Sequence, residues 1–493
     1  MASDIQSSTL PPAQPAYVFR GHAAHVHSVQ FVRQNSRLLT GDADGYIVLW
    51  NLASKRPVAV WQAHDAAILG FAEWEPDRII THGRDNSLKV WQLRASEEER
   101  FSIIPPTDGV STHRPQPWLL HSLAVNTLNF CAFSMCLERP ACKPLQKQGT
   151  INEQATAHNG ATNSILVAVP ATEDKKVDIF QIPSEQRIYT VPRVPSTNTG
   201  MVMVLKLLYH TPQHLLLVAG YESGHTAVHQ LGCTKPSSPQ PTWYNIYLSQ
   251  PHAQPILSLD VSPDVKTYFT SSADAIIAAH HIPNPVTLDQ GTNGPAAPSI
   301  TSVSSSTTSP SIPSTSFAAN PSASALPSTP APSVLSATPA PPTASNLISI
   351  PAQLNPIQPS QPFKLANTKH AGQQSLRIRS DSRILATAGW DGRVRVYSTK
   401  TLTELAVLKW HRVGVYTVDF ADISVGAAPK DISMHTEGEG IDAITTKGVG
   451  VGDVDRVEDF MKRLERQREE KVREKHWIVA GGKDGKVSLW EIY

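Results

Sequence analysis

The chain has 493 residues, with 43 Lys and Arg against 42 Asp and Glu and a formal net charge of +1. This balance argues against a dedicated nucleic-acid binder, which usually has a strong basic excess. No stretch offers about 18 unbroken apolar residues, so no membrane span is expected. The four cysteines, Cys131, Cys136, Cys142 and Cys233, form no CxxC pair, so neither a zinc ribbon nor a disulfide framework is indicated and a reducing compartment is favoured.

The chain starts with MASDIQSSTLPPAQPAY (1–17), which has no charged start followed by an apolar run and so is not a secretory signal. It leads into AYVF (16–19), a short β-prone segment. The next stretch, FRGHAAHVHSVQF (19–31), holds His22, His25 and His27.

These three histidines raise the question of a metal site, because histidine is a common metal ligand. His25 and His27 lie two residues apart on an expected strand and therefore share one face. No Cys, Asp or Glu nearby completes a ligand set, so a structural role is favoured over a metal site.

Four stretches share one pattern: an apolar strand, a polar turn with Asp, and a second strand that ends in an aromatic residue. They are LLTGDADGYIVLWNL (38–52), IITHGRDNSLKVWQL (79–93), ILATAGWDGRVRVYS (384–398) and WIVAGGKDGKVSLWEI (477–492). In each, the Asp precedes the aromatic by six residues: Asp44 and Trp50, Asp85 and Trp91, Asp391 and Tyr397, Asp484 and Trp490. A histidine lies upstream of each pair: His22, His64, His370 and His411. Four matches at one spacing indicate an internal repeat.

Three weaker copies follow the same spacing and bring the count to seven. In these, Asp174 precedes Phe180, Ser223-Gly224 replaces Asp-Gly, and Asp274 precedes His280. The expected repeats cover approximately 17–52, 57–93, 118–182, 199–231, 251–282, 363–398 and 405–493. Without the insertions each repeat has about 46 residues, close to the 40–45 of propeller blades. The pattern predicts a single all-β domain over 1–493, a seven-bladed β-propeller.

Three insertions interrupt the repeats, at 139–160, 283–362 and 423–476. Residues 283–362 are rich in Ser, Pro and Thr and are expected to be disordered. The segment is interpreted either as a tolerated loop expansion or as a site of phosphorylation at pairs such as Ser309-Pro310. FKLAN (363–367) is then expected to form the outer strand of blade five. Residues 423–476 are predicted to contain a charged helix, whose apolar stripe either packs on the propeller rim or docks a partner. The stripe consists of Val457, Phe460, Met461 and Leu464.

The chain ends on KVSLWEIY, the third strand of the seventh repeat, so the last blade lacks an outer strand. AYVF (16–19) is expected to supply it and to close the ring without unpaired edges.

The repeats resemble the WD-repeat family of β-propellers, with GH near the start, although Asn, Gln or Glu follows the tryptophan in place of Asp. The resemblance implies that each blade holds a hydrogen-bonded set of histidine, Ser/Thr, Asp and aromatic residue. The implied sets are His22, Thr40, Asp44, Trp50; His64, Thr81, Asp85, Trp91; His370, Thr387, Asp391, Tyr397; and His411, Asp484, Trp490. The last set is expected to be incomplete, because Ala480 occupies the Ser/Thr position.

No Walker A loop, HExxH or GxSxG motif is found, so no enzyme, catalytic residue, metal or cofactor is expected and a binding platform is favoured. The stretches PAYVFRGHAAHVHSVQF, LLTGDADGYIVLW, HAGQQSLRIRSDSRILATAGWDGRVRVYS and HWIVAGGKDGKVSLWEIY resemble the fungal ASTRA-associated protein 1 family, itself similar to the animal G-protein β-subunit-like family.

This resemblance implies a scaffold subunit of the nuclear ASTRA complex, linked to chromatin remodelling and to maturation of phosphatidylinositol-3-kinase-related kinases. The implied partners are protein subunits, with no small-molecule substrate, direct nucleic-acid contact or membrane, and the implied location is the nucleus, with the cytoplasm as a further site. The alternative is a propeller adaptor of another complex, such as a ubiquitin-ligase substrate receptor or a G-protein β-like scaffold. A G-protein β subunit proper would begin with a coiled-coil helix, which Pro11, Pro12 and Pro15 oppose.

Overall fold

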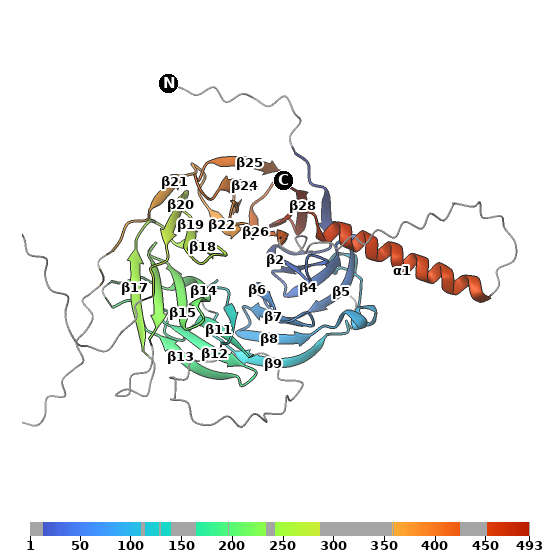
Figure 1. Cartoon of the computed structure of the whole chain (residues 1–493), viewed down its shortest axis with the longest axis horizontal. Helices are drawn as coiled ribbons and strands as arrows, with labels where there is room; N and C mark the ends of the chain where they lie inside the picture. The colour runs from blue at the N-terminus through green and yellow to red at the C-terminus, as the bar shows by residue number, and fades with distance from the viewer. Residues whose placement is uncertain are drawn as a thin grey trace, which may run out of the picture. The chain divides into compact units, whose positions relative to one another are not determined.

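The computed structural model describes residues 13–109, 114–127, 130–139, 164–195, 197–232, 242–285, 357, 359–423 and 451–492; within 451–460 it describes the backbone alone. These residues form seven four-stranded antiparallel sheets arranged as blades around a centre (Figure 1). The predicted seven-bladed β-propeller is therefore confirmed.

The first four blades follow each other along the chain, each running from the inner to the outer strand. Blade one comprises β2 (Val26–Val32), β3 (Arg37–Asp42), β4 (Tyr46–Asn51) and β5 (Arg56–Gln62). Blade two comprises β6 (Ile68–Glu73), β7 (Arg78–Gly83), β8 (Ser87–Gln92) and β9 (Trp118–Ala124). Blade three comprises β10 (Ser134–Leu137), β11 (Ile165–Pro170), β12 (Val177–Ile182) and β13 (Gln186–Val191). Blade four comprises β14 (Val202–Thr211), β15 (His214–Tyr221), β16 (Thr226–Leu231) and β17 (Trp243–Ser249).

The last three blades include the two strands expected next to the insertions and chain ends. Blade five comprises β18 (Ile256–Val261), β19 (Thr267–Ser272), β20 (Ile276–His281) and β21 (Lys364–Asn367), so FKLAN does supply its outer strand. Blade six comprises β22 (Gln373–Ile378), β23 (Ile384–Gly389), β24 (Arg393–Ser398) and β25 (Glu404–Lys409). Blade seven comprises β26 (Val415–Phe420), β27 (Trp477–Gly482), β28 (Lys486–Glu491) and β1 (Tyr17–Arg20).

The ring is closed by β1, which pairs antiparallel with β28 from Tyr17 opposite Leu489 to Arg20 opposite Lys486. Phe19, on this strand, is 1% exposed, and its ring centroid lies 5.0 Å from that of Trp50 in blade one. The predicted closure by the N-terminal segment is confirmed, with the strand one residue further along the chain than AYVF. It removes the unpaired edge that β28 would otherwise present.

The hydrophobic core lies between neighbouring blades, where the face of one sheet packs on the face of the next. One cluster joins Val48 and Trp50 of blade one to Val479 and Leu489 of blade seven. Both faces of a blade are covered in this way, so β3 and β27 are buried along almost their whole length. In β27, WIVAGG, this burial goes with a strand that has no polar or charged side chain.

Side-chain acceptors on inner strands also connect the blades. Ser258 and Asp260 of β18 accept hydrogen bonds from the backbone N–H groups of Leu376 and Ile378 on β22, both at 3.0 Å. In the same way, Asp419 of β26 accepts from the N–H of Phe31 on β2, at 3.0 Å, where the last blade meets the first. These bonds satisfy backbone donors that no strand partner reaches.

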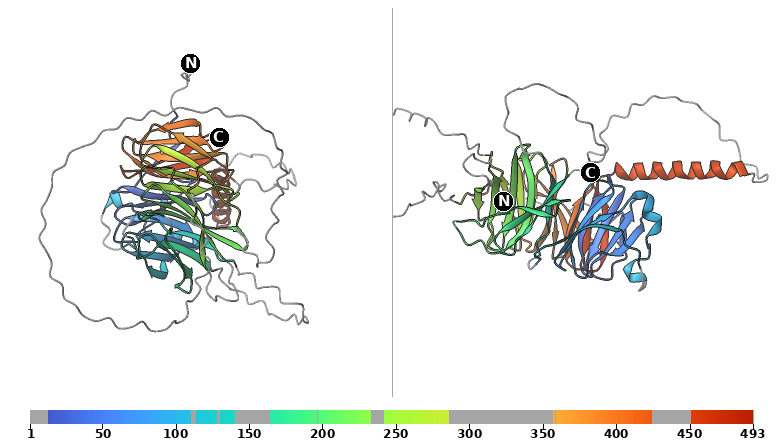
Figure 2. Two further views of the ribbon diagram at one scale, coloured as in Figure 1. Left: turned by 90° about the vertical axis from the view of Figure 1, so that its left-hand side faces the viewer. Right: turned by 90° about the horizontal axis from the view of Figure 1, so that it is seen from below.

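The strands run from one face of the ring to the other (Figure 2), and the two faces differ in the connections that they carry. One face, here called the loop face, carries the turns from the second to the third strand and the connections between blades, none longer than 192–201. The opposite face, here called the insertion face, carries every long connection, including 138–164, 232–242, 282–363 and 421–476. Nearly all of the expected insertions 139–160 and 283–362 lies outside the described residues, so the disorder predicted for 283–362 stays a prediction.

The charged helix expected within 423–476 is α1 (Val451–Arg473). Its C-terminal end is attached to the ring: Glu469 forms an ion pair with Arg37 at 2.9 Å, and Val472 packs on the core of blades seven and one. In the predicted apolar stripe, Met461 is 56% exposed and therefore does not pack on the rim, whereas Leu464 is half-buried. The side chains of the other two stripe residues lie outside the described part.

Candidate functional site

Blade one contains a buried hydrogen-bond network just below the loop face. The Trp50 Nε1–H donates to Thr40 Oγ1 at 2.8 Å, and the same oxygen lies 2.7 Å from His22 Nε2. His22 Nδ1 lies 2.7 Å from Asp42 Oδ2. Such polar groups are costly inside a sheet stack unless each has a partner, and here each does.

The carboxylate in this network is that of Asp42 and not of Asp44, so the expectation for Asp44 was wrong. Asp42 is fully buried, and its second oxygen accepts the N–H groups of Asp44 and Tyr46, both at 3.0 Å. Asp44 itself is exposed at the tip of the turn. The physical reason is local: at the place of Asp42, blade two has Gly83, whose missing side chain leaves room for the histidine ring.

Blade two assembles all four residues assigned to it. The Trp91 Nε1–H donates to Thr81 Oγ1 at 2.9 Å, His64 Nε2 lies 2.7 Å from the same oxygen, and His64 Nδ1 lies 2.9 Å from Asp85. Burial lowers the pKa of His64, which favours the neutral ring. Thr81 then accepts from Trp91 and donates to Nε2, and Nδ1–H donates to Asp85. Burial acts to raise the pKa of Asp85, but bonds from Ser87 and His64 outweigh it and hold that pKa below its usual value.

Blade six does not assemble the set assigned to it. His370 is partly exposed, lies 3.9 Å from Asp391 and makes no hydrogen bond to Thr387 or Tyr397 within the described residues. Asp391 is instead bound twice by the guanidinium of Arg395, at 2.6 and 3.1 Å. Arg395 is 1% exposed and pairs with Thr387 on the neighbouring strand. Its guanidinium thus binds the turn Asp, as the histidine does in blade two.

Blade seven has the hydroxyl that Ala480 was expected to leave missing, although His411 Nδ1 makes no hydrogen bond within the described residues. His411 Nε2 lies 2.9 Å from Ser488 Oγ, and the Trp490 Nε1–H donates to the same oxygen at 3.0 Å. His411 Nδ1 lies 3.4 Å from Asp484. The hydroxyl therefore comes from the neighbouring strand at the residue that pairs with Ala480.

Blade five holds a set that was not assigned from the sequence. His252 lies 3.1 Å from Asp274 and 2.8 Å from Thr270, and His280 takes the place of the tryptophan at 3.4 Å from Thr270. The signal was present, because Asp274 precedes His280 by six residues and His252 opens the same repeat. The set was not recognised because a histidine, His280, occupies the position of the tryptophan.

The other two histidines of the opening stretch serve a different purpose. His27 is stacked on Tyr416 with ring centroids 5.4 Å apart, and His25 meets the same ring edge-on at 6.0 Å. Burial, and secondly His25, lowers the pKa of His27. Across the described part of the chain, no group of three His, Cys, Asp or Glu side chains is placed to hold a metal ion.

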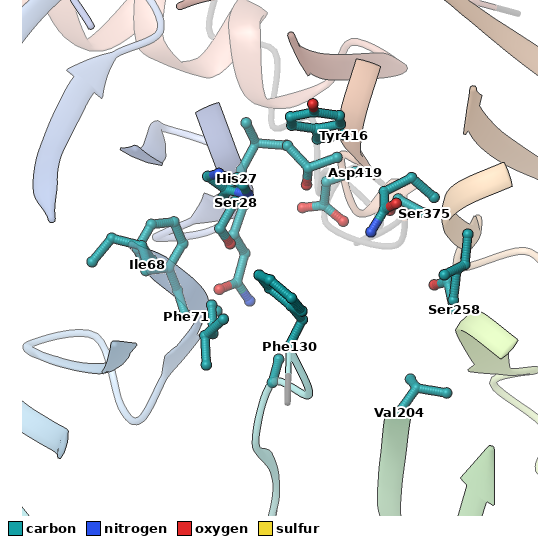
Figure 3. A pocket seen from close by; sticks show the side chains of 18 of the residues that line it. His27, Ser28, Ile68, Phe71, Phe130, Val204, Ser258, Ser375, Tyr416 and Asp419 are labelled. Carbon is teal, nitrogen blue, oxygen red and sulfur yellow. The ribbon is translucent and has the colours of Figure 1, made fainter. Parts of the chain in front are cut away.

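Both histidines line a cavity of ≈540 Å³ at the centre of the ring, to which six blades and the connection from blade two to blade three contribute (Figure 3). His27, Ser28 and Tyr416 lie on one side of it, with Phe71 and Phe130 next along the wall. The half-buried carboxyl of Asp419 also faces it, and desolvation raises the pKa of this carboxyl to about 6. The wall thus combines aromatic rings with hydroxyl, carboxyl and guanidinium groups, which suits binding of a polar chain segment.

No helix in the described ranges is both long and apolar enough to span a membrane.

Comparisons with known proteins cover nearly the whole chain. The sequence model of the family described as ASTRA-associated protein 1 matches residues 15–490. The chain is 41% identical to the ASTRA-associated protein 1 of Pyricularia oryzae, over 99% of this chain and 100% of that protein. It is 38% identical to that of Aspergillus niger, over 98% of both chains, and 29% identical to that of Schizosaccharomyces pombe, over 82% of this chain and 93% of the relative. The chain therefore belongs to the ASTRA-associated protein 1 family.

Proposed function

We propose that this protein is a non-catalytic WD-repeat scaffold subunit of the ASTRA complex. The observation that carries the proposal is the full-length similarity to fungal proteins named ASTRA-associated protein 1, in which both chains are covered almost completely. A ring of seven blades, closed on itself, supplies a rigid platform with two surfaces of different construction. Such a platform binds proteins without needing a catalytic centre.

The finer parts of the proposal follow from that membership. The protein acts in the nucleus, and also in the cytoplasm, in chromatin remodelling and in the maturation of phosphatidylinositol-3-kinase-related kinases. Its partners are protein subunits of the complex, and it takes no small-molecule substrate, cofactor, nucleic acid or membrane as its own ligand. The two different faces allow two partners to be held at once.

The test is affinity purification of the tagged full-length chain from nuclear extract, with the bound proteins identified by mass spectrometry. Recovery of ASTRA subunits in amounts comparable to the bait supports the proposal. Recovery of a ubiquitin ligase or of G-protein γ and α subunits, without ASTRA subunits, overturns it in favour of another propeller adaptor. A parallel purification from cells that carry only the tag identifies background proteins.

A further inference from the structure

An exposed tryptophan marks one part of the loop face, on blade six. Trp390 is 48% exposed, yet its Nε1–H donates to Gln374 Oε1 at 2.8 Å. Its ring lies against Gly372, where a Cβ atom would come within 2.2 Å of the ring atoms. The ring is therefore held in one orientation while its outer surface stays in solvent. Preorganised, exposed tryptophans of this kind are typical anchors of protein interfaces.

Trp390 borders a hollow of ≈520 Å³ between blades six and seven, next to the cavity at the centre of the ring. The hollow is lined by His25, Trp390, Val413, Gly414, Tyr416, Lys483 and Asp484. Val413 is 39% exposed, so it offers a second apolar surface beside the tryptophan.

Four cations lie at the loop-face ends of blades six and seven, and one of them, Lys483, lines the hollow. Arg393 and Lys409 are both exposed and stand directly opposite each other in the pairing of β24 with β25. Like charges in this arrangement destabilise a sheet. Arg412 follows in the next loop and Lys483 in the next turn, both exposed. Within the described residues none of these four side chains forms an ion pair.

The carboxylates of the same region are already bound from within. Asp391 is held by Arg395, and Asp484 lies between His411 and Lys486. The four cations therefore retain uncompensated charge, although the chain as a whole carries a net charge of only +1. Two cations that repel each other and have no carboxylate of the same chain beside them are expected where a binding partner supplies the negative charge.

We propose that this surface, here called the Trp390 surface (Trp390, Arg393, Lys409, Arg412, Val413 and Lys483), binds an acidic, extended segment of a partner protein. An apolar side chain of the segment rests between Trp390 and Val413, and its carboxylates face the four cations. A protein segment is favoured over nucleic acid because the cations are few and local, and because the exposed apolar pair requires an apolar side chain. The inference rests on the proposed scaffold function and names the chemistry of one partner.

The test measures binding of the purified full-length chain to a short fluorescein-labelled peptide of Glu, Asp and Leu, by fluorescence anisotropy. The double variant Arg393→Glu, Lys409→Glu should weaken binding at least about tenfold and reduce its salt dependence. Trp390→Ala should weaken binding on the order of 30-fold, as expected for an aromatic anchor. The matched control is Arg56→Glu, Lys400→Glu, which reverses two exposed cations on the insertion face and should leave the affinity unchanged.

Three results would overturn the inference: no binding of the acidic peptide, equal loss in the control variant, or tighter binding of a DNA duplex that depends on the same cations. Thermal melts of all variants show that they are folded. The same variants are then used as baits in nuclear extract. If ASTRA subunits are recovered normally by Arg393→Glu, Lys409→Glu, the inference fails while the scaffold function stands; loss of one subunit from this bait alone supports it.

Discussion

Ser488 of β28 lies directly opposite Ala480 of β27, and its hydroxyl makes both bonds that a threonine on the second strand makes in blades one and two. Residues opposite each other in an antiparallel pair are close enough to exchange such a role. The same position in blade six holds Arg395, opposite Thr387, and there the network is rebuilt around a guanidinium. Cross-strand partners, and not single positions, therefore determine whether a blade keeps its network.

The first prediction concerns this hydroxyl. Ser488→Ala should lower the free energy of unfolding by about 1–3 kcal/mol, because the Trp490 N–H and His411 Nε2 lose their buried partner. Adding Ala480→Ser to this variant should recover part of the loss, since that position can reach the same two groups. Urea denaturation of the wild type and the two variants checks both statements. An unchanged midpoint for Ser488→Ala would show that the network contributes nothing in blade seven.

The second prediction compares three tryptophans. Trp50 and Trp91 are 3% and 2% exposed, so Trp50→Ala and Trp91→Ala should each cost about 3–5 kcal/mol, the range for removing a buried large aromatic. Trp390→Ala should stay within about 0.5 kcal/mol of the wild type, because that ring is half in solvent. Chemical denaturation of the three variants gives the comparison. Similar losses for all three would contradict the assignment of Trp390 to a binding surface.

Much of the fold could be predicted from the sequence because the repeat pattern that defines each blade is local. A strand, a turn with Asp and a second strand ending in an aromatic residue are readable within fifteen residues, as between Leu38 and Leu52. The closing strand was also predictable, because the chain ends one strand short of a complete blade. The outer strands β13 and β17 fell outside the expected repeats, since outer strands lack the network residues.

The network residues were less predictable because they depend on contacts across strands. Asp42 and Asp44 are two residues apart in one turn, and only the position of the His22 ring decides which carboxylate it meets. Arg395 displaces His370 through its length and charge, which no spacing rule contains. The exposure of Trp390 and the opposition of Arg393 and Lys409 likewise exist only once the strands are paired.

The third prediction concerns ring closure. Deletion of residues 1–20 removes β1 and exposes the edge of β28, and exposed edges recruit other strands. The truncated protein should therefore aggregate or form oligomers in size-exclusion chromatography with light scattering. Deletion of residues 1–10, which ends before Tyr17, should leave a monomer of unchanged melting temperature. If both truncated chains are equally soluble and monomeric, pairing of β1 is not needed for closure.

The fourth prediction concerns pH and rests on buried histidines. Burial lowers the pKa of His82 and His280 to about 3 and that of His229 to about 4. His82 Nδ1 also accepts the N–H of Phe133 at 3.2 Å, a bond that protonation of that nitrogen would break. In the unfolded chain these rings titrate near 6.5. Their contribution to stability is complete above about pH 6.5 and is lost as the pH falls toward their folded values.

Asp419 changes the free energy of unfolding with pH in the opposite direction. Burial raises its pKa to about 6 against about 3.9 in the unfolded chain, so its contribution is complete below about 3.9 and is lost as the pH rises through 6. Between about pH 6.5 and 4.5 three histidines outweigh one carboxyl, and the free energy of unfolding should fall on acidification. His82→Gln, which keeps an acceptor for Phe133, should flatten this decline by about 1.4 kcal/mol per pH unit, and Asp419→Asn should steepen it by a similar amount. Urea midpoints across this range measure both slopes, and a decline that neither variant alters would assign the pH dependence to other groups.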